Sequence, residues 1–245
     1  MLKYRIAELN VAMEARYEGT LRQGEAYRYD FDGEPDFEIP AVPDSEIEAL
    51  RAENPLLTPN ICEYMQTGSI FYAQLLRHDG MLLHASAVAY DGDAYLFSGP
   101  CGIGKSTHAR MWRKRFGPEN AVIINDDKPA LRLVNDRFFV YGTPWSGKSR
   151  YNLNIRVPLA GIALLRRSET NVMTRADDPD AVHFLLNQTI RPPARSSVET
   201  LLFLLDRIFE STPVYRFGLL ADLSAAQLAY ETMRPNKENR QEDSP

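Results

Sequence analysis

The segment from Gly99 to Ser106 reads Gly-Pro-Cys-Gly-Ile-Gly-Lys-Ser and fits the phosphate-binding pattern G-x-x-x-x-G-K-[ST]. Glycines let the backbone turn so that several N–H groups point into one hollow, and a following helix adds its positive N-terminal end. Lys105 would supply a cation for the outer phosphates, and Ser106 a hydroxyl for Mg²⁺. We therefore predict a site for ATP and Mg²⁺, with these nucleotide-binding residues: Gly99, Pro100, Cys101, Gly102, Ile103, Gly104, Lys105, Ser106 and Thr107.

The residues on either side of this loop support the prediction. The apolar run 94–97 is typical of a strand. After the loop, Ala109, Trp112 and Phe116 are spaced as one face of a helix, and four basic residues fall largely on the other face. A strand, a glycine loop and a helix in this order favour a phosphate site over a chance glycine turn.

Paired carboxylates follow the next short apolar run, 122–124, at Asp126 and Asp127. One could bind Mg²⁺ and the other could take a proton from an attacking hydroxyl. Neighbouring residues on a strand point opposite ways, so the two acids should do different jobs. We favour Asp126 as the base and Asp127 as the metal ligand, although the sequence does not order them. The alternative is a solvated acidic turn before a proline.

Two loops carry candidate substrate contacts. In residues 142–150, Trp145 could cover the site, and Lys148 and Arg150 could clamp a substrate. The alternative is that the indole packs in the core and the cations are solvated. Arg191 and Arg195, in a proline-rich loop, are further candidates for phosphate contacts.

Composition excludes several classes of protein. The 245 residues are 44% hydrophobic, which suffices for a packed core. The net charge is −5, with 28 basic and 33 acidic residues and no long basic run, so nucleic acid is not an expected partner. Two cysteines make no disulfide framework and favour the cytoplasm. Neither a signal peptide nor an apolar run of membrane-spanning length is present, so no membrane span is expected. A homo-oligomer is left open.

The patterning upstream of the phosphate loop predicts a small β-rich region over residues 1–56. Leu9, Val11 and Met13 alternate with polar residues, as do Tyr27 and Tyr29. A short helix is expected over 46–54, and Thr58-Pro59 should start a helix that runs to about residue 77.

A hairpin is expected over 81–98, because two apolar runs are joined by Asp91-Gly92. Its second arm feeds the phosphate loop, so the sheet should be mixed rather than wholly parallel. Further strands are expected after 121, 129, 136, 156, 170 and 213, and helices at 179–188 and 224–233. Between them, Ser196 and Glu199 resemble a capping box, and these residues should face a core: Val198, Leu201, Leu202, Leu205, Ile208 and Phe209.

Taken together and in order, several motifs resemble the C-terminal catalytic domain of HPr kinase/phosphorylase, and more narrowly the short stand-alone HPr-kinase-like proteins. The motifs are LLHASAV, LFSGPCGIGKST, INDDKP, GTPWSGK and NIRVPLAGIALLRRS. The resemblance covers about residues 80–175, with weaker agreement to about 234. It implies a nucleotide-binding core shared with phosphoenolpyruvate carboxykinase: α/β, with a mixed, largely antiparallel sheet.

The resemblance also implies roles for particular residues. His84, which by pattern alone would be a core residue of an apolar strand, matches the active-site histidine of the family. Lys105 and Ser106 match its phosphate and metal groups, and Asp126 and Asp127 its paired acids. The family has a glutamate where Thr107 stands, a Pro-Glu-Ile-Arg-Gly stretch that is missing here, and a different first domain. The resemblance therefore does not extend to HPr as the substrate or to the reverse phosphorolysis.

We therefore predict a catalytic domain over residues 57–234, after the N-terminal region and before a disordered tail, 235–245. The predicted activity is ATP- and Mg²⁺-dependent transfer of the γ-phosphate to a hydroxyl, with serine of a peptide, a protein or a small molecule as the acceptor. The alternatives are a nucleotide-binding sensor without phosphotransfer and a phosphoenolpyruvate carboxykinase-like enzyme.

Overall fold

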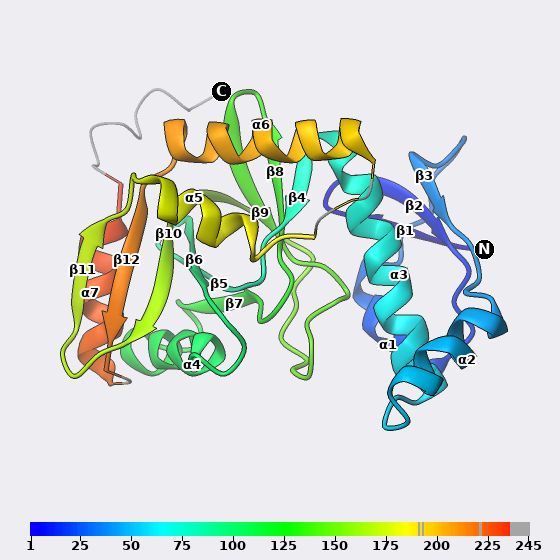
Figure 1. Ribbon diagram of the computed structural model, residues 1–245, viewed down its shortest axis with the longest axis horizontal. Coiled ribbons are helices and arrows are strands. Elements are labelled where there is room, and N and C mark those ends of the chain that lie inside the picture. The colour runs from blue at the N-terminus through cyan, green and yellow to red at the C-terminus, as the bar shows by residue number, and fades with distance from the viewer. Residues whose placement is uncertain (191, 193, 221, 236–245) are drawn as a thin grey trace.

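The structure is a computed structural model that describes residues 1–190, 192, 194–220 and 222–235. A large sheet with helices on both sides fills one part of the molecule, and a small sheet with three helices forms the other (Figure 1). Arg191 and all but the first residue of the expected tail lie outside the described residues. Within the described residues, no helix has the length and apolar character needed to cross a membrane.

The large sheet has nine strands and is mixed, as the sequence predicts. The strands are β4 (Gly80–Leu82), β5 (Ala85–Tyr90), β6 (Asp93–Ser98), β7 (Val122–Asn125), β8 (Ala130–Val134), β9 (Arg137–Tyr141), β10 (Arg156–Arg167), β11 (Val172–Arg175) and β12 (Val214–Leu219). Their order is β4-β8-β9-β10-β6-β5-β7, with β12 on β10 and β11 on β12. Within this sheet, only the β10–β6 and β10–β12 pairs are parallel among the described strand pairs.

The predicted hairpin at Asp91-Gly92 is confirmed. Tyr90 pairs with Asp93, and both turn residues have positive φ, 52° and 84°. Two positive φ angles define the turn type whose twist matches paired strands. The hairpin joins β5 to β6, so the strand that enters the phosphate loop has an antiparallel neighbour on one side and the parallel β10 on the other.

Helices cover both faces of the large sheet (Figure 1). On one face lie α4 (Lys105–Phe116) and α7 (Leu223–Met233), which pack against Tyr95 and Phe97 of β6. On the other lie α5 (Pro179–Leu186) and α6 (Arg195–Ser211), which share a core with Leu96. Successive strand residues point to opposite faces, so β6 contributes to both cores and is held firmly where it meets the loop.

The N-terminal region contains the strands β1 (Leu2–Ile6), β2 (Leu9–Met13) and β3 (Phe37–Ile39), and the helices α1 (Glu18–Gly24), α2 (Asp44–Glu53) and α3 (Pro59–Leu75). Thr58 caps α3 by accepting a hydrogen bond from the Ile61 N–H, as its sequence position predicts. The expected strand through Tyr27 and Tyr29 is wrong. A 3-10 turn, Glu25–Tyr27, continues α1 and buries the Tyr27 ring in the core of the small sheet.

The small sheet is not separated from the rest of the chain by its own core. One hydrophobic cluster joins Tyr4 and Val11 of the sheet to Phe71 of α3 and to Trp145, which lies in the loop after β9. The expected boundary after residue 56 therefore divides α3 from the strands against which it packs. This cluster fixes the position of the small sheet relative to the loop that follows β9.

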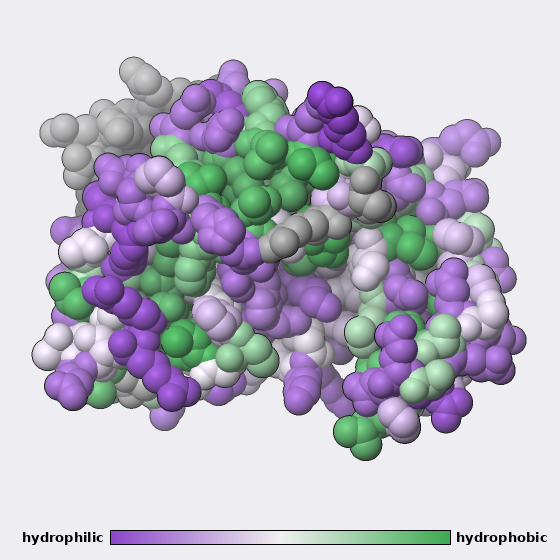
Figure 2. All heavy atoms as spheres, in the orientation of Figure 1, coloured by the Kyte–Doolittle hydropathy of each residue, from purple (hydrophilic) through white to green (hydrophobic). Residues whose placement is uncertain are grey.

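Helix α6 departs from the sequence prediction at its start. It begins at Arg195 after Ala194, and no side-chain cap is formed, so the predicted capping box is wrong. Glu199 instead forms an ion pair with Arg195. The buried face includes Leu204, whereas Leu202, expected to face the core, is 42% exposed. Apolar surface gathers along α6 (Figure 2), where Phe203 is also exposed.

Candidate functional site

The glycine loop connects the end of β6 to the first turn of α4 and adopts backbone angles that require glycine. Gly102 and Gly104 have φ angles of 77° and 116°. A Cβ atom at either position would meet no other atom within 4 Å, so the requirement comes from the backbone and not from crowding. Gly104 is the N-cap of α4, which leaves the first-turn N–H groups without a side-chain cap. Such a helix start can bind an anion.

Lys105 folds back over this loop. Its side chain is nearly buried, and Nζ donates hydrogen bonds to the carbonyl oxygens of Gly99 at 2.7 Å and Pro100 at 3.3 Å. Burial lowers the pKa of Lys105, and the charge of Asp127 opposes that shift. Among the described residues, the ammonium group thus has only neutral hydrogen-bond partners, and the charges of Asp127 and Asp126 act on it. An incoming phosphate would supply the missing anionic partner.

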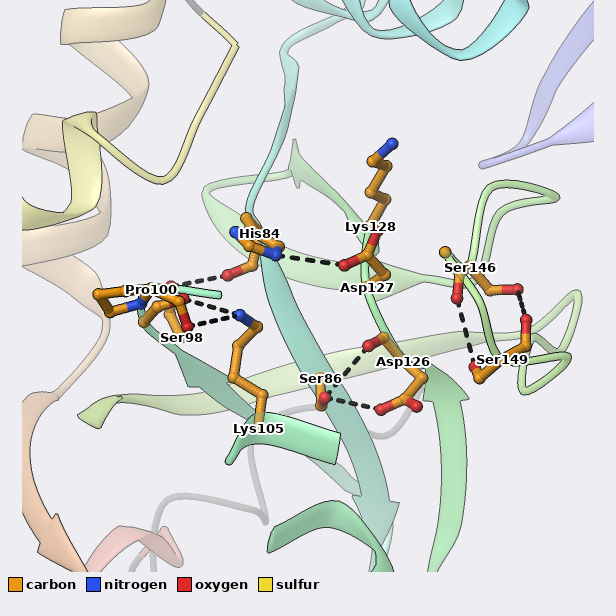
Figure 3. A network of polar contacts seen from close by, with 12 residues as sticks. His84, Ser86, Ser98, Pro100, Lys105, Asp126, Asp127, Lys128, Ser146 and Ser149 are labelled. Atoms are coloured by element: carbon orange, nitrogen blue, oxygen red, sulfur yellow. Dashed lines mark hydrogen bonds and ion pairs between the residues drawn. The ribbon is translucent and has the colours of Figure 1, made fainter. Parts of the chain in front are cut away.

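The paired acids lie beside this lysine and have different partners (Figure 3). Asp126 is 5% exposed, and Oδ1 accepts a hydrogen bond of 2.7 Å from the Ser86 hydroxyl on β5. The Asp127 side chain is 27% exposed, and its Oδ1 lies 3.2 Å from His84 Nε2. Each carboxylate thus has one oxygen engaged by a different neighbour, and the two side chains can act separately.

Asp127 remains ionised although it is partly buried. Burial raises its pKa, but the hydrogen bond from His84 and the charges of Lys128 and Lys105 outweigh that effect and hold the pKa below its usual value. A carboxylate that stays charged near the loop is suited to bind a metal ion. Among the described residues, no three His, Cys, Asp or Glu side chains gather as a ready-made metal site. Magnesium sites commonly use one or two carboxylates together with phosphate oxygens.

His84 lies in the break between β4 and β5, and not within a strand as expected. Its N–H donates to the Gln188 carbonyl at 2.8 Å, and its own carbonyl accepts a 2.9 Å hydrogen bond from Ser98. Because Ser98 is the last residue before the glycine loop, this hydrogen bond links His84 to the start of that loop. The structure therefore brings His84, Lys105, Asp126 and Asp127 together at one edge of the sheet (Figure 3).

Asn125 is a positioning residue that the sequence reasoning missed. It is fully buried, and its Oδ1 accepts hydrogen bonds from the N–H groups of Asp127 at 3.0 Å and Lys128 at 2.7 Å. Its Nδ2 donates to the carbonyl oxygens of Thr143 and Trp145. Asn125 thus holds the acidic turn against the loop after β9. An asparagine that ends an apolar strand directly before two acids was the available signal.

Arg167 is a second residue that the sequence reasoning missed. Its guanidinium NH2 lies 3.3 Å from the carbonyl oxygen of Gly102. Arg167 ends β10, which runs parallel to β6 with Leu164 opposite Ser98. The carboxyl ends of parallel neighbours reach the same edge of a sheet, which is why a basic residue there meets the phosphate loop.

The candidate substrate residues differ in exposure: the tryptophan is buried and the described cations are exposed. Trp145 is 1% exposed, its ring packs 4.8 Å from that of Phe71, and its indole N–H donates to Thr67 at 3.2 Å. Of the two alternatives for Trp145, the structure therefore confirms that the indole packs in the core and does not cover the site. Lys148 and Arg150 are exposed in the same loop. Arg195 is 92% exposed on the first turn of α6, where it pairs with Glu199.

Gly147 is required where the loop after β9 meets Asp127. Its φ is 67°, and a Cβ atom would lie 2.8 Å from Cγ of Asp127. Gly147→Ala is expected to lose about 1–2 kcal/mol from backbone strain and, in addition, to displace Asp127. Gly92→Ala is the matched control, because Gly92 has a φ of 84° and its Cβ would meet nothing within 4 Å.

Urea unfolding and phosphotransfer measured on both variants separate the two effects. We expect similar losses of stability, with turnover lost only in Gly147→Ala. Equal turnover in the two variants would show that the position of Asp127 does not limit the reaction.

Comparison with known proteins finds distant likeness among solved structures. No protein family and no curated protein matches the sequence. A matching solved structure is that of the Hpr(Ser) kinase/phosphatase from Coxiella burnetii, at 12% sequence identity and a TM-score of 0.37. The alignment covers 66% of this chain and 97% of that chain. At these values the match assigns neither a family nor an activity to this chain.

Proposed function

We propose that this protein is an ATP- and Mg²⁺-dependent kinase that transfers the γ-phosphate to an acceptor hydroxyl, with serine as the preferred acceptor. The observation that carries the proposal is the convergence of one buried cation and two differently held carboxylates on a glycine loop that opens a helix. The motif alone supports nucleotide binding. The acids beside it add the groups that a transfer to a hydroxyl requires.

The donor set fits magnesium–ATP, which when bound would supply the phosphoryl group to be transferred. The loop N–H groups and Lys105 would hold the phosphate oxygens, and Ser106 the metal. Asp127, whose charge opposes the lowering of the Lys105 pKa by burial, would be the second metal ligand. His84 would orient that carboxylate through its other oxygen.

Asp126 would then take the proton from the acceptor hydroxyl. The Ser86 hydroxyl donates to Oδ1 and fixes the orientation of the carboxylate, which leaves Oδ2 for the acceptor. Positioned proton transfer of this kind contributes roughly 10²–10⁴-fold to a rate. The remaining acceleration would come from placing the reactants in line and from neutralising charge on the phosphates.

A nucleotide sensor without phosphotransfer is the second candidate. It is favoured by the absence of a glutamate at Thr107 and of the family's Pro-Glu-Ile-Arg-Gly stretch. Against it stands the network around the acids, because a protein that only binds nucleotide does not need a histidine-held carboxylate and a serine-held carboxylate together.

The decisive experiment is incubation with γ-labelled ATP, Mg²⁺ and a panel of acceptors: HPr, serine-containing peptides and free serine. We expect label on at least one acceptor, and roughly 10²–10⁴-fold slower labelling when Asp126→Asn replaces the wild-type protein. Calorimetric binding of magnesium–ATP is measured in parallel. Tight binding with no transfer to any acceptor would support the sensor and reject the kinase.

A further inference from the structure

An extended segment, residues 150–155, runs along β7, on the side of that strand away from β5. The Leu153 N–H donates to the Ile124 carbonyl at 2.9 Å, and the Asp126 N–H donates to the Tyr151 carbonyl at 3.2 Å. The segment is therefore attached to the strand that carries the acids. Its side chains alternate between two environments, as in a strand.

One side of the segment is anchored to the N-terminal region by asparagines. Asn152 donates to the Gln23 side chain of α1 at 3.0 Å, and Asn154 donates to the carbonyl oxygens of Arg5 and Ala26. The segment also lies close against Gly142, the residue after β9. An added Cβ there would sit 1.9 Å from the Leu153 carbonyl oxygen, so only glycine allows this approach. Figure 1 shows this part of the chain between α4 and α1.

The alternate positions of the segment are apolar and exposed. Tyr151, Leu153 and Ile155 are 41%, 40% and 37% exposed. Folded proteins rarely leave a row of three such side chains on an ordered strand-like segment unless something covers it.

A groove lies between this apolar row and the C-terminal part of α4. Its volume is about 240 Å³, and its lining includes Val122 and Ile123 of β7 and Pro118. Two cations complete the lining, Arg113 of α4 and Arg150 of the segment, and the Arg113 guanidinium lies over the Tyr151 ring at 5.4 Å. The groove thus has an apolar floor with positive charge beside it.

The positive charges of the groove are not neutralised within the described chain. Neither Arg113 nor Arg150 forms an ion pair with any described acid, and Nε of Arg113 is buried without a hydrogen-bond partner among the described residues. The described residues that line the groove include these two arginines and no acid. The whole chain carries a net charge of −5, so the lining differs in sign from the protein as a whole. An acidic occupant would complement it.

From these observations we infer that the groove docks an acidic segment of a peptide acceptor, one with apolar side chains at alternate positions. The inference rests on the proposed function and names its substrate class, a peptide and not a small molecule. Apolar side chains of the peptide cover the row at Tyr151 and Leu153, and its carboxylates meet Arg113 and Arg150. The groove is linked to the proposed base through Tyr151, which lines it and whose carbonyl accepts the Asp126 N–H.

The test uses two synthetic fluorescein-labelled peptides, Glu-Leu-Glu-Val-Glu-Leu-Gly-Ser-Gly and the same peptide with lysine in place of glutamate. Anisotropy titration with the full chain, without nucleotide, measures docking alone. We expect the acidic peptide to bind at least tenfold more tightly than the basic one. The double variant Tyr151→Ser, Leu153→Ser and the variant Arg150→Glu should each weaken that binding at least tenfold.

The control is Phe203→Ser, which removes a 52% exposed apolar side chain from α6, away from the groove. It should leave peptide binding unchanged, and thermal melts confirm that all variants fold. In the transfer assay, the double variant Tyr151→Ser, Leu153→Ser should raise KM for the peptide with kcat unchanged and should leave transfer to free serine unaffected.

The outcomes separate this inference from the proposed function. Peptide binding that depends on the groove, with no transfer to any acceptor, supports docking and rejects the kinase. Transfer to free serine, with equal binding of the two peptides or no effect of the groove variants, supports the kinase and overturns the docking inference.

Discussion

Lys105→Ala is expected to abolish phosphotransfer and to weaken binding of magnesium–ATP. Lys105 is the cation whose ammonium group lies over the phosphate loop, on the carbonyl oxygens of Gly99 and Pro100. A hydrogen bond between charged partners contributes about 1.5–3 kcal/mol, so affinity should fall roughly 10–100-fold. Charge stabilisation in the transition state is lost as well, so turnover should fall by a further factor of about 10²–10³.

Calorimetry with magnesium–ATP and the labelled-phosphate assay measure the two losses for Lys105→Ala. Lys114→Ala is the matched control, since Lys114 lies on the same helix and is exposed. Both measurements should be near wild type for the control. If Lys105→Ala binds magnesium–ATP as tightly as the wild-type protein, the assignment of the phosphate loop is wrong.

The paired acids give the second large effect, because Asp126→Asn and Asp127→Asn should both suppress transfer by different routes. Loss of the base should leave binding of magnesium–ATP near normal and reduce turnover by roughly 10²–10⁴-fold. Loss of the metal ligand should raise the Mg²⁺ concentration needed and weaken nucleotide binding. The proposal assigns the first behaviour to Asp126, held by Ser86, and the second to Asp127, held by His84.

Titration of Mg²⁺ against nucleotide affinity and turnover, for each variant, distinguishes these routes. Exchanged behaviours would reverse the two roles and keep the mechanism. Near-normal turnover in both variants, with an acceptor that the wild-type protein phosphorylates, would show that the two acids form a turn and take no part in transfer. Asparagine is the appropriate substitution because it keeps the shape of aspartate and the ability of one oxygen to accept a hydrogen bond from Ser86 or His84.

Local patterns in the sequence were sufficient for the elements around the loop. The glycine spacing predicted the turn before α4, Asp91-Gly92 predicted the hairpin, and the hairpin predicted a mixed sheet. These features depend on residues that are close in the chain, where backbone preferences and the period of apolar residues act directly. The prediction was wrong for Tyr27, whose ring is buried in the core of the small sheet, and for the start of α6, where Glu199 pairs with Arg195 instead of forming a cap.

The sequence by itself thus determined that the chain has a glycine loop of the phosphate-binding pattern on a strand–helix junction, with two acids at the end of a following strand. Only the tertiary structure decided that His84 meets Asp127, that Ser86 holds Asp126 and that Trp145 turns into the core. The physical reason is that these pairs are formed across β4, β5, β7 and α3. Sheet order and register bring such residues together, and no local pattern records which distant residue will lie opposite.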